Sequence, residues 1–342
     1  MDPGPKPPTF RAPRRAKVPP RIGIPAALTL AAFLLGPRVQ VDESVVPVDL
    51  GDDPEAFLSA EEGAVQGLRP GDGKEIVWAD AEARERTPVS IVYLHGFSAD
   101  RHEIDPVPKR VADALGANLF YTRLSGHGRD GAAMAEATAG AWLQDVEEAL
   151  TVGTAMGERV IVLGTSTGGT LALWAAAQER WREHLQALVL VSPNLKVRDR
   201  NARLLLWPWG EAAARFVLGP ERCFEPVNQG QARHWTTCYP TEALLPMMAL
   251  VERVRTLDFR DASTPVLVLY SPEDQVVDPA GTERVLAQYG AASVERHTMT
   301  GSGDPGQHVL AGDLMSPGTT DSVVDTILGF LERARGSPGG GD

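Results

Sequence analysis

The segment RVIVLGTSTGGTLALWAAA, residues 159–177, restricts the possible folds of this chain more than any other. It opens with the apolar run VIVL, which is rich in β-branched residues and predicts a buried strand. It ends with TLALWAAA, which consists mainly of strong helix formers. Between the two, Gly164 and Gly168 flank Ser166 at a spacing typical of a very tight turn. The sequence therefore predicts a strand, a sharp turn that presents a serine hydroxyl, and a helix.

Such a turn suits a nucleophilic serine, because neighbours without bulk let the hydroxyl stand clear of the backbone. The turn also aims the amide of Thr167 at the point where negative charge develops on a reacting carbonyl. The positive end of the following helix adds to this effect. A G-x-S-x-G pattern met alone also occurs as a plain structural turn, but the strand and helix around it favour Ser166 as a nucleophile.

The composition is typical of one large α/β domain with additional segments, since the chain has 342 residues of which 43% are hydrophobic. A formal net charge of −12 argues against a nucleic-acid partner. No C-x-x-C or His/Cys spacing typical of metal sites occurs, and we expect neither a metal nor a cofactor. Cys223 and Cys238 are compatible with a disulfide or with two thiols, and both interpretations stay open.

The amino-terminal region has its own charge pattern. Residues 1–21 hold six lysines and arginines against one aspartate, and we expect them to form a basic disordered tail. Residues 22–37 carry no charge and would span about 24 Å as a helix. We expect an uncleaved signal anchor that tethers the chain to a membrane, with the catalytic domain outside the cytoplasm, in a periplasm or its equivalent. A cleaved signal and a helix packed on the domain are the alternatives, and a chain without an anchor is expected in the cytoplasm.

Strand and helix patterns alternate over residues 75–335. Buried strands are predicted near residues 75–78, 89–94, 118–122, 160–163, 185–191, 266–270 and 293–299. Helices are predicted near residues 54–63, 105–115, 138–156, 170–177, 279–289 and 320–335. This alternation favours an α/β fold with a mostly parallel sheet and helices on both faces.

Three segments interrupt or flank this alternation. Residues 193–258 hold helical pieces but no pattern of a buried parallel strand, and we expect them to form an inserted helical lid. Residues 38–74 are acidic and contain several glycines, and we expect a tether that leads into the domain. Residues 336–342 are rich in glycine and are expected to be a flexible tail.

Five motifs along the domain, LHGFSAD, RLSGHG, GTSTGG, SPEDQVVDP and GQHVL, resemble those of the α/β-hydrolase superfamily. The resemblance is greatest to the group of monoacylglycerol lipases, carboxylesterases and serine aminopeptidases, and it covers residues 75–335. It implies the α/β-hydrolase fold and a nucleophile at Ser166. An acid and then a histidine are expected to follow along the chain.

The resemblance also suggests which acid and which histidine these are. Asp274 follows the predicted strand at 266–270 and is the expected acid, with Glu273 and Asp278 as alternatives. His308 lies in the loop before the last helix and is the expected base, whereas His297 lies within a predicted strand.

The amides of Phe97 and Thr167 are expected to form the oxyanion hole. In this family, His95 and His127 are expected to support the loops that hold these amides. Asp304 is expected to be a solvated loop carboxylate, with an orienting role as the alternative.

These assignments imply a serine hydrolase that cleaves carboxylic esters, with a small-molecule acyl ester or a lipid-like molecule as its substrate. Two alternatives stay open: an aminopeptidase or other acyl hydrolase on the same fold, and a membrane-tethered binding protein without catalysis. Several large side chains of the lid segment are expected either to line an acyl pocket or to form a small core of the lid itself. They are Trp207, Trp209, Phe216, Trp235, Met247 and Met248.

Overall fold

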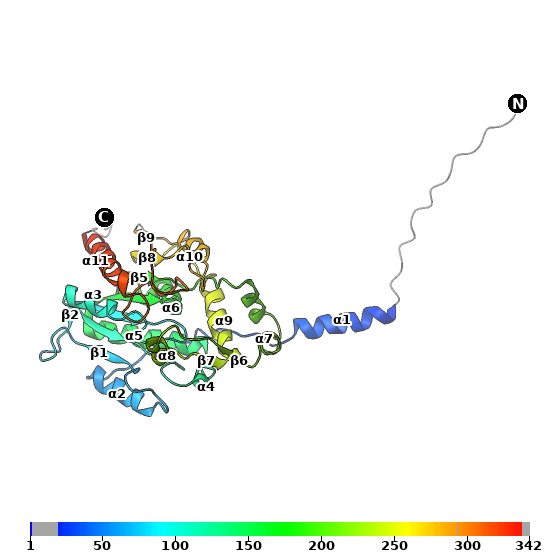
Figure 1. Ribbon diagram of the computed structural model, residues 1–342, viewed down its shortest axis with the longest axis horizontal. Helices are drawn as coiled ribbons and strands as arrows, with labels where there is room; N and C mark the ends of the chain where they lie inside the picture. Colours follow the sequence, from blue (N-terminus) through cyan, green and yellow to red (C-terminus); the bar gives the residue numbers. More distant parts are fainter. Residues whose placement is uncertain (2–19, 292, 337–342) are drawn as a thin grey trace.

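The computed structural model describes Met1, residues 20–291 and residues 293–336 (Figure 1). A seven-stranded sheet forms the centre of the domain, in the order β1-β3-β2-β4-β5-β8-β9. Strand β1 pairs antiparallel with β3, and all other neighbours pair in parallel. The prediction of a mostly parallel sheet is confirmed. The strands are β1 (Glu75–Val77), β2 (Thr87–Leu94), β3 (Asn118–Tyr121), β4 (Gly157–Thr165), β5 (Leu185–Val191), β8 (Val266–Tyr270) and β9 (Val294–Thr298).

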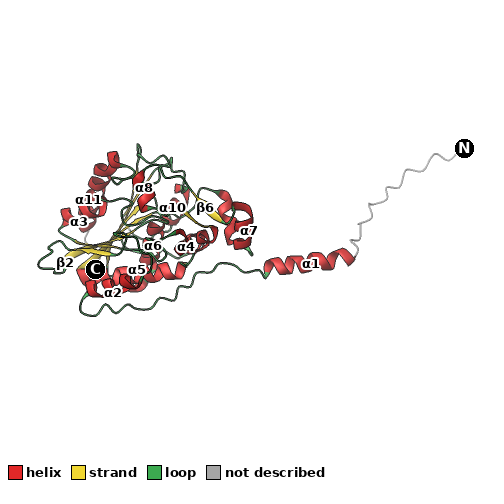
Figure 2. Ribbon diagram, turned by 60° about the horizontal axis from the view of Figure 1, so that its bottom comes forward, coloured by secondary structure: helices red, strands yellow, loops and turns green. Residues whose placement is uncertain are grey.

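Helices cover both faces of the sheet, as Figure 2 shows for α3 and α11 on one side and α5 on the other. The first face carries α3 (Val107–Leu115) and α11 (Thr320–Gly336). The second face carries α5 (Ala139–Met156), α6 (Thr167–Ala177) and α10 (Pro279–Leu286). Short helices lie in the connections: α2 (Pro54–Ala64), α4 (Gly131–Met134), η1 (Glu179–Trp181) and η4 (Pro317–Thr319).

Strand β4 shows why the central strands are continuously apolar. Val160 and Val162 belong to the hydrophobic cluster of α5 and α6, whereas Ile161 and Leu163 belong to the cluster of α3 and α11. Successive side chains of a strand point to opposite faces, so a strand covered by helices on both sides must be apolar at every position. This burial fixes the strand that leads into Ser166.

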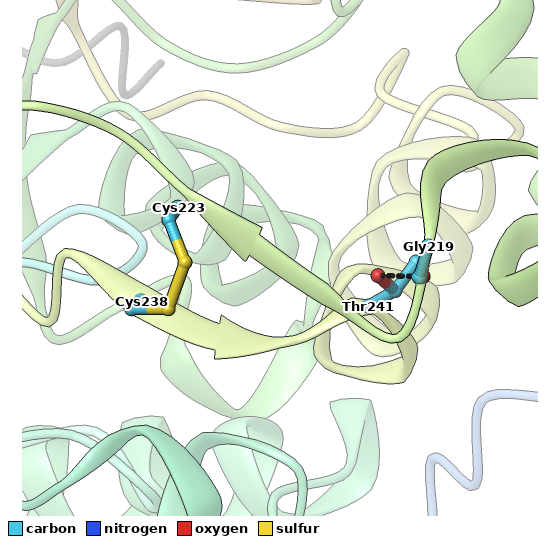
Figure 3. Close-up of a disulfide and its surroundings, with 4 residues drawn as sticks. All are labelled: Gly219, Cys223, Cys238 and Thr241. Carbon is cyan, nitrogen blue, oxygen red and sulfur yellow. Dashed lines mark hydrogen bonds between the residues drawn. A yellow bond between two sulfur atoms is a disulfide. The ribbon is translucent and has the colours of Figure 1, made fainter.

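The segment between β5 and β8 folds into short helices and a separate two-stranded sheet. Its elements are η2 (Arg200–Leu206), α7 (Gly210–Leu218), β6 (Glu221–Cys223), α8 (Gln229–His234), β7 (Cys238–Pro240), η3 (Thr241–Ala243) and α9 (Leu244–Val254). Strands β6 and β7 pair antiparallel, and a disulfide joins Cys223 to Cys238 across them (Figure 3). Beyond the other end of the pair, Thr241 Oγ1 donates a hydrogen bond of 2.7 Å to the carbonyl of Gly219. The sequence pattern does not predict this pair, because such short and largely exposed strands show no alternation of apolar and polar residues.

The segment expected as a tether lies against the domain over part of its length. Val39, Val41 and Val45 pack against the hydrophobic cluster of α5 and α6. The backbone of Val46 donates to and accepts from the side-chain amide of Gln144, with both bonds 2.8 Å long. Residues 39–50 therefore form a strap along α5.

The uncharged amino-terminal segment forms helix α1 (Pro20–Leu34), which extends away from the domain (Figure 1). Its end meets the insertion, where the indole Nε1 of Trp209 donates to the carbonyl of Ala32 over 3.2 Å. Among the described residues, no helix has both the length and the apolar character that a membrane crossing requires. The signal anchor expected at residues 22–37 is therefore not supported, and the location of the domain in the cell stays a prediction. The tails expected at residues 1–21 and 336–342 lie almost entirely outside the described residues.

Candidate active site

Ser166 lies in a strained turn between β4 and α6. Its backbone has φ 52° and ψ −114°, in a region that residues with a side chain rarely adopt. A Cβ atom on Gly168 would lie 1.9 Å from the carbonyl oxygen of Leu94, and one on Gly164 would lie 2.5 Å from that of Gly168. Both positions therefore need glycine. The Ser166 amide donates to the carbonyl of Val191 over 2.9 Å, which ties the turn to the neighbouring strand β5.

His308 and Asp274 meet at the same end of the sheet. The Nδ1 atom of His308 lies 2.7 Å from Oδ2 of Asp274, which is fully buried in the loop after β8. The other carboxylate oxygen accepts hydrogen bonds from the amides of Val276 and Val277, at 2.7 and 2.9 Å. The carboxylate is thus held from one side while it orients the imidazole from the other.

The pKa of His308 reflects two opposing effects. Burial acts to lower this pKa, but the hydrogen bond to Asp274 and the charge of its carboxylate act to raise it. Smaller contributions in the same direction come from Glu103 and Asp304. The net result is a pKa raised above the ordinary value for histidine.

Asp304 fixes the backbone of the histidine loop, and the expectation that it is solvated is wrong. Its side chain is buried, and Oδ2 accepts hydrogen bonds from the amides of His308 and Val309, both at 2.9 Å. Oδ1 accepts another from the amide of Gly306 at 3.0 Å. The loop turns back on itself around this carboxylate, and a buried carboxylate with these partners is stable only in that conformation.

Ser166 and His308 line one cavity of about 550 Å³, together with Phe97, Glu103 and Asn194. The Ser166 hydroxyl forms no hydrogen bond to the residues that the structure describes, so it is free to meet a ligand. Most of the cavity wall comes from apolar side chains of the insertion. They include Leu204, Leu205, Ala214, Val217, Leu218, Trp235, Leu244, Met247 and Met248.

The large side chains singled out in the insertion separate into two groups. Trp235, Met247 and Met248 line the cavity and are buried. Trp207, Trp209 and Phe216 do not line it and are exposed on the outside of the insertion. Periodicity in short helices is too weak to distinguish the inner group from the outer one.

The loop after β2 carries Phe97 beside the cavity. The Nε2 atom of His127 accepts a hydrogen bond from the Ser98 amide at 3.0 Å, and Nε2 of His95 accepts one from the Leu124 amide at 3.1 Å. Burial lowers the pKa of His95 to about 4 and that of His127 well below its usual range. Both rings are therefore neutral acceptors that hold loops in place. Within the described part of the chain, the amides of Phe97 and Thr167 donate to no protein group, and both are available to a ligand.

The alternative acid and base residues lie elsewhere. Asp278 caps the start of α10, where its carboxylate accepts from the Ala280 amide at 3.0 Å and pairs with Lys196. Glu273 is exposed in the loop beside Asp274. His297 is exposed on the edge strand β9. Of the candidate acids and bases, the structure brings only Asp274 and His308 together at the cavity that Ser166 lines.

A second group of histidines and carboxylates joins α8 to the core. It comprises Asp72, Asp100, His102 and His234. Both imidazoles donate from Nδ1 to Asp100, at 2.9 and 3.0 Å, and Asp72 pairs with Arg69 and Arg233. The residue types of this group suit a divalent cation. However, two guanidinium groups already neutralise the carboxylates, so the arrangement favours an ion-pair network.

Sequence reasoning missed Glu103, which is buried and lines the cavity. The residue lies in the loop after LHGFSAD, where a charged side chain normally suggests solvent exposure. No periodicity or motif distinguishes it, and only the packing of the loop against β2 buries it.

Three features together define an α/β-hydrolase. They are the order of the sheet, the strained turn at Ser166, and the buried pair of Asp274 after β8 and His308 after β9. Residues 86–303 match the family model described as serine aminopeptidase, S33, and the chain belongs to this family. It is an enzyme of the α/β-hydrolase superfamily and resembles the lipases and esterases within it.

Individual relatives support this placement. The chain is 26% identical over 212 residues to a thermostable monoacylglycerol lipase from Bacillus sp. (strain H-257), covering 62% of this chain and 80% of the relative. A structure from work on two metagenome-derived lipolytic enzymes, LipS and LipT, matches with a TM-score of 0.64 at 20% identity, over 78% of this chain and 99% of that one. A soluble variant of monoglyceride lipase from Saccharomyces cerevisiae matches with a TM-score of 0.57 at 16% identity, over 76% and 91%. The two structural matches establish the fold.

Proposed function

We propose that the protein is a serine hydrolase that cleaves carboxylic ester bonds through an acyl-enzyme. The observation that carries this proposal is that Ser166 and His308 line the same cavity, with His308 bound to the buried Asp274. A serine hydroxyl is a weak nucleophile and needs a neighbouring base. A base needs a partner that fixes its tautomer, and Asp274 has the contacts for that role.

In the proposed reaction, Ser166 Oγ attacks the acyl carbonyl carbon while the free ring nitrogen of His308 accepts its proton. The amides of Phe97 and Thr167 stabilise the oxyanion. His308 then returns the proton to the leaving alcohol as the carbon–oxygen bond breaks. A water molecule, deprotonated by the same histidine, releases the acid and regenerates Ser166.

The cavity supports an acyl ester with an extended apolar part as the substrate. Its volume of about 550 Å³ and its aliphatic wall suit a fatty acyl chain. The wall comes largely from the insertion, which we propose acts as a lid that sets the preferred acyl length. Likeness to monoacylglycerol lipases supports a lipid-like ester of this kind.

The family description keeps an aminopeptidase as the second candidate. A peptide's terminal ammonium group requires an ionised carboxylate in the cavity. Glu103, Asp304 and Asp199 are the carboxyl groups that line the cavity. Each of them already accepts a hydrogen bond from a backbone amide, that of Gly96, His308 or Asn201 respectively. These features favour an ester substrate.

Two experiments test the proposal. A fluorescent serine-reactive phosphonate should label the wild-type protein and leave Ser166→Ala unlabelled, which separates an enzyme from a binding protein. A panel of acyl esters of graded chain length, run beside aminoacyl amides, should then give turnover on the esters. Turnover on the aminoacyl amides alone would replace the esterase assignment with a peptidase.

A further inference from the structure

Glu103 is a buried carboxyl group that the proposed reaction does not use. It is 2% exposed and belongs to the loop that follows Phe97. Its Oε2 atom accepts a hydrogen bond of 2.7 Å from the amide of Gly96, the residue before Phe97. A Cβ atom on Gly96 would lie 2.6 Å from Oε1 of the same carboxyl, so the contact leaves no space for a larger residue.

A tyrosine extends this contact to the serine turn. The hydroxyl of Tyr93 lies 3.3 Å from Oε2 of Glu103 and 3.3 Å from Oγ1 of Thr165. Thr165 is the last residue of β4 and directly precedes Ser166. Glu103 and Tyr93 therefore connect the loop that holds the Phe97 amide to the turn that holds the nucleophile. All three side chains are buried, so the connection is shielded from water.

The same carboxyl lies close enough to His308 to influence its charge. Both side chains line the cavity, and Glu103 acts to raise the pKa of His308. Burial raises the pKa of Glu103 itself to about 7, against the Gly96 hydrogen bond and the charge of His308, which act to lower it. The other charged or titratable groups around the two are Tyr93 and Asp100 near Glu103, and Asp274 and Asp304 near His308.

We propose that Glu103 is a positioning residue for ester hydrolysis, which holds the Phe97 amide in the oxyanion hole through Gly96 and contributes a carboxylate to the cavity that His308 lines. The inference rests on the proposed function. The carboxylate stabilises the imidazolium that forms as Ser166 attacks, and it requires a higher pH before His308 becomes neutral in the free enzyme.

The two roles predict different effects for two substitutions. Glu103→Gln keeps an acceptor for the Gly96 amide and removes the charge. It should lower the pKa of His308, so the acid limb of the kcat/KM profile moves to lower pH, with kcat within about tenfold of wild type. Glu103→Ala removes the acceptor as well. It should lower kcat by roughly 100-fold with little change in KM, the scale expected when one oxyanion donor is misplaced.

The experiment is a set of pH–rate profiles on a short soluble ester for wild type, Glu103→Gln, Glu103→Ala and Glu147→Gln. Glu147 is the matched control, since it is a buried glutamate of α5 that does not line the cavity, and its variant should keep the wild-type profile. Circular dichroism establishes that each variant is folded. If Glu103→Ala does not fold, the shift of the acid limb in Glu103→Gln remains the test.

Wild-type kcat in Glu103→Ala, or an unshifted acid limb in Glu103→Gln, overturns the inference. Recovery of kcat by glutamine relative to alanine, together with the shifted limb, supports it. Phosphonate labelling of the wild-type protein keeps this result separate from the proposed function. A protein that is neither labelled nor active contradicts the hydrolase assignment. A labelled and active protein whose Glu103 variants keep the wild-type kcat and the wild-type pH profile contradicts only the role of Glu103.

Discussion

At the scale of single residues, the site depends on which carboxylate orients His308. Asp274→Asn should keep the fold and lose about 10⁴-fold in kcat, because an amide in this position favours the wrong imidazole tautomer. Asp278→Asn is the matched control, since Asp278 lies four residues along the same loop and caps α10 instead. It should stay within a few-fold of wild type. Steady-state kinetics on both variants, with circular dichroism for folding, decides the assignment. An inactive Asp278→Asn beside an active Asp274→Asn would show that the wrong acid has been chosen.

The pH dependence of the reaction belongs to the same scale. Only neutral His308 can accept the serine proton, and its pKa is raised by Asp274 despite burial. Activity should therefore rise with pH, with the midpoint of the acid limb of kcat/KM above the ordinary histidine value of about 6.5. A midpoint clearly below that value in the wild-type profile would contradict the proposed environment of His308.

The residues of the site were predictable to different degrees. Ser166 could be found because a G-x-S-x-G turn needs a buried strand before it and a helix after it, and both leave clear patterns. His308 and Asp274 needed the order of motifs in a known family. The buried positions of Glu103 and Asp304 left no signal, because their loops fold around carboxylates by packing and hydrogen bonding that no local pattern encodes.

At the scale of elements, the insertion between β5 and β8 is expected to control the acyl length. Ala214 of α7 is buried and lines the cavity, whereas Ala212 on the same helix is exposed and does not. Ala214→Phe should fill part of the cavity and reduce kcat/KM for long acyl esters by more than tenfold, while a short ester is affected little. Ala212→Phe should leave the whole acyl profile unchanged. Equal profiles for the two variants across the ester panel would argue against this role of the insertion.

The elements themselves show what a sequence pattern can and cannot predict. The central parallel strands β2, β4, β5 and β8 each contain a buried, mainly apolar run, and most flanking helices combine apolar spacing with clear start and stop residues. Their predicted bounds therefore agree with the structure within a few residues. The β6–β7 pair was missed, since each strand has only three residues, too few to show an alternation of apolar and polar side chains. Long-range pairing of this kind depends on contacts that lie outside any sequence window.

At the scale of the whole molecule, the strap formed by residues 39–50 is expected to stabilise the domain. Val39, Val41 and Val45 pack on it, and Glu43 pairs with Arg253 of α9. Each partly buried valine contributes on the order of 1 kcal/mol. A chain starting at residue 39 should melt within about 2 °C of the full chain, and one starting at residue 53 several degrees lower. Differential scanning calorimetry measures both. Equal melting temperatures for the two truncations would show that the strap adds nothing.

The central claim is that Ser166, His308 and Asp274 act as one catalytic unit on an ester. The most direct measurement is kcat on a short soluble ester for Ser166→Ala, His308→Ala and the double variant, each shown to be folded. We predict that each single variant loses nearly all turnover, on the order of 10⁶-fold, and that the double variant loses little more than either. Full hydrolysis by Ser166→Ala would contradict the account, and so would losses in the two single variants that multiply in the double variant.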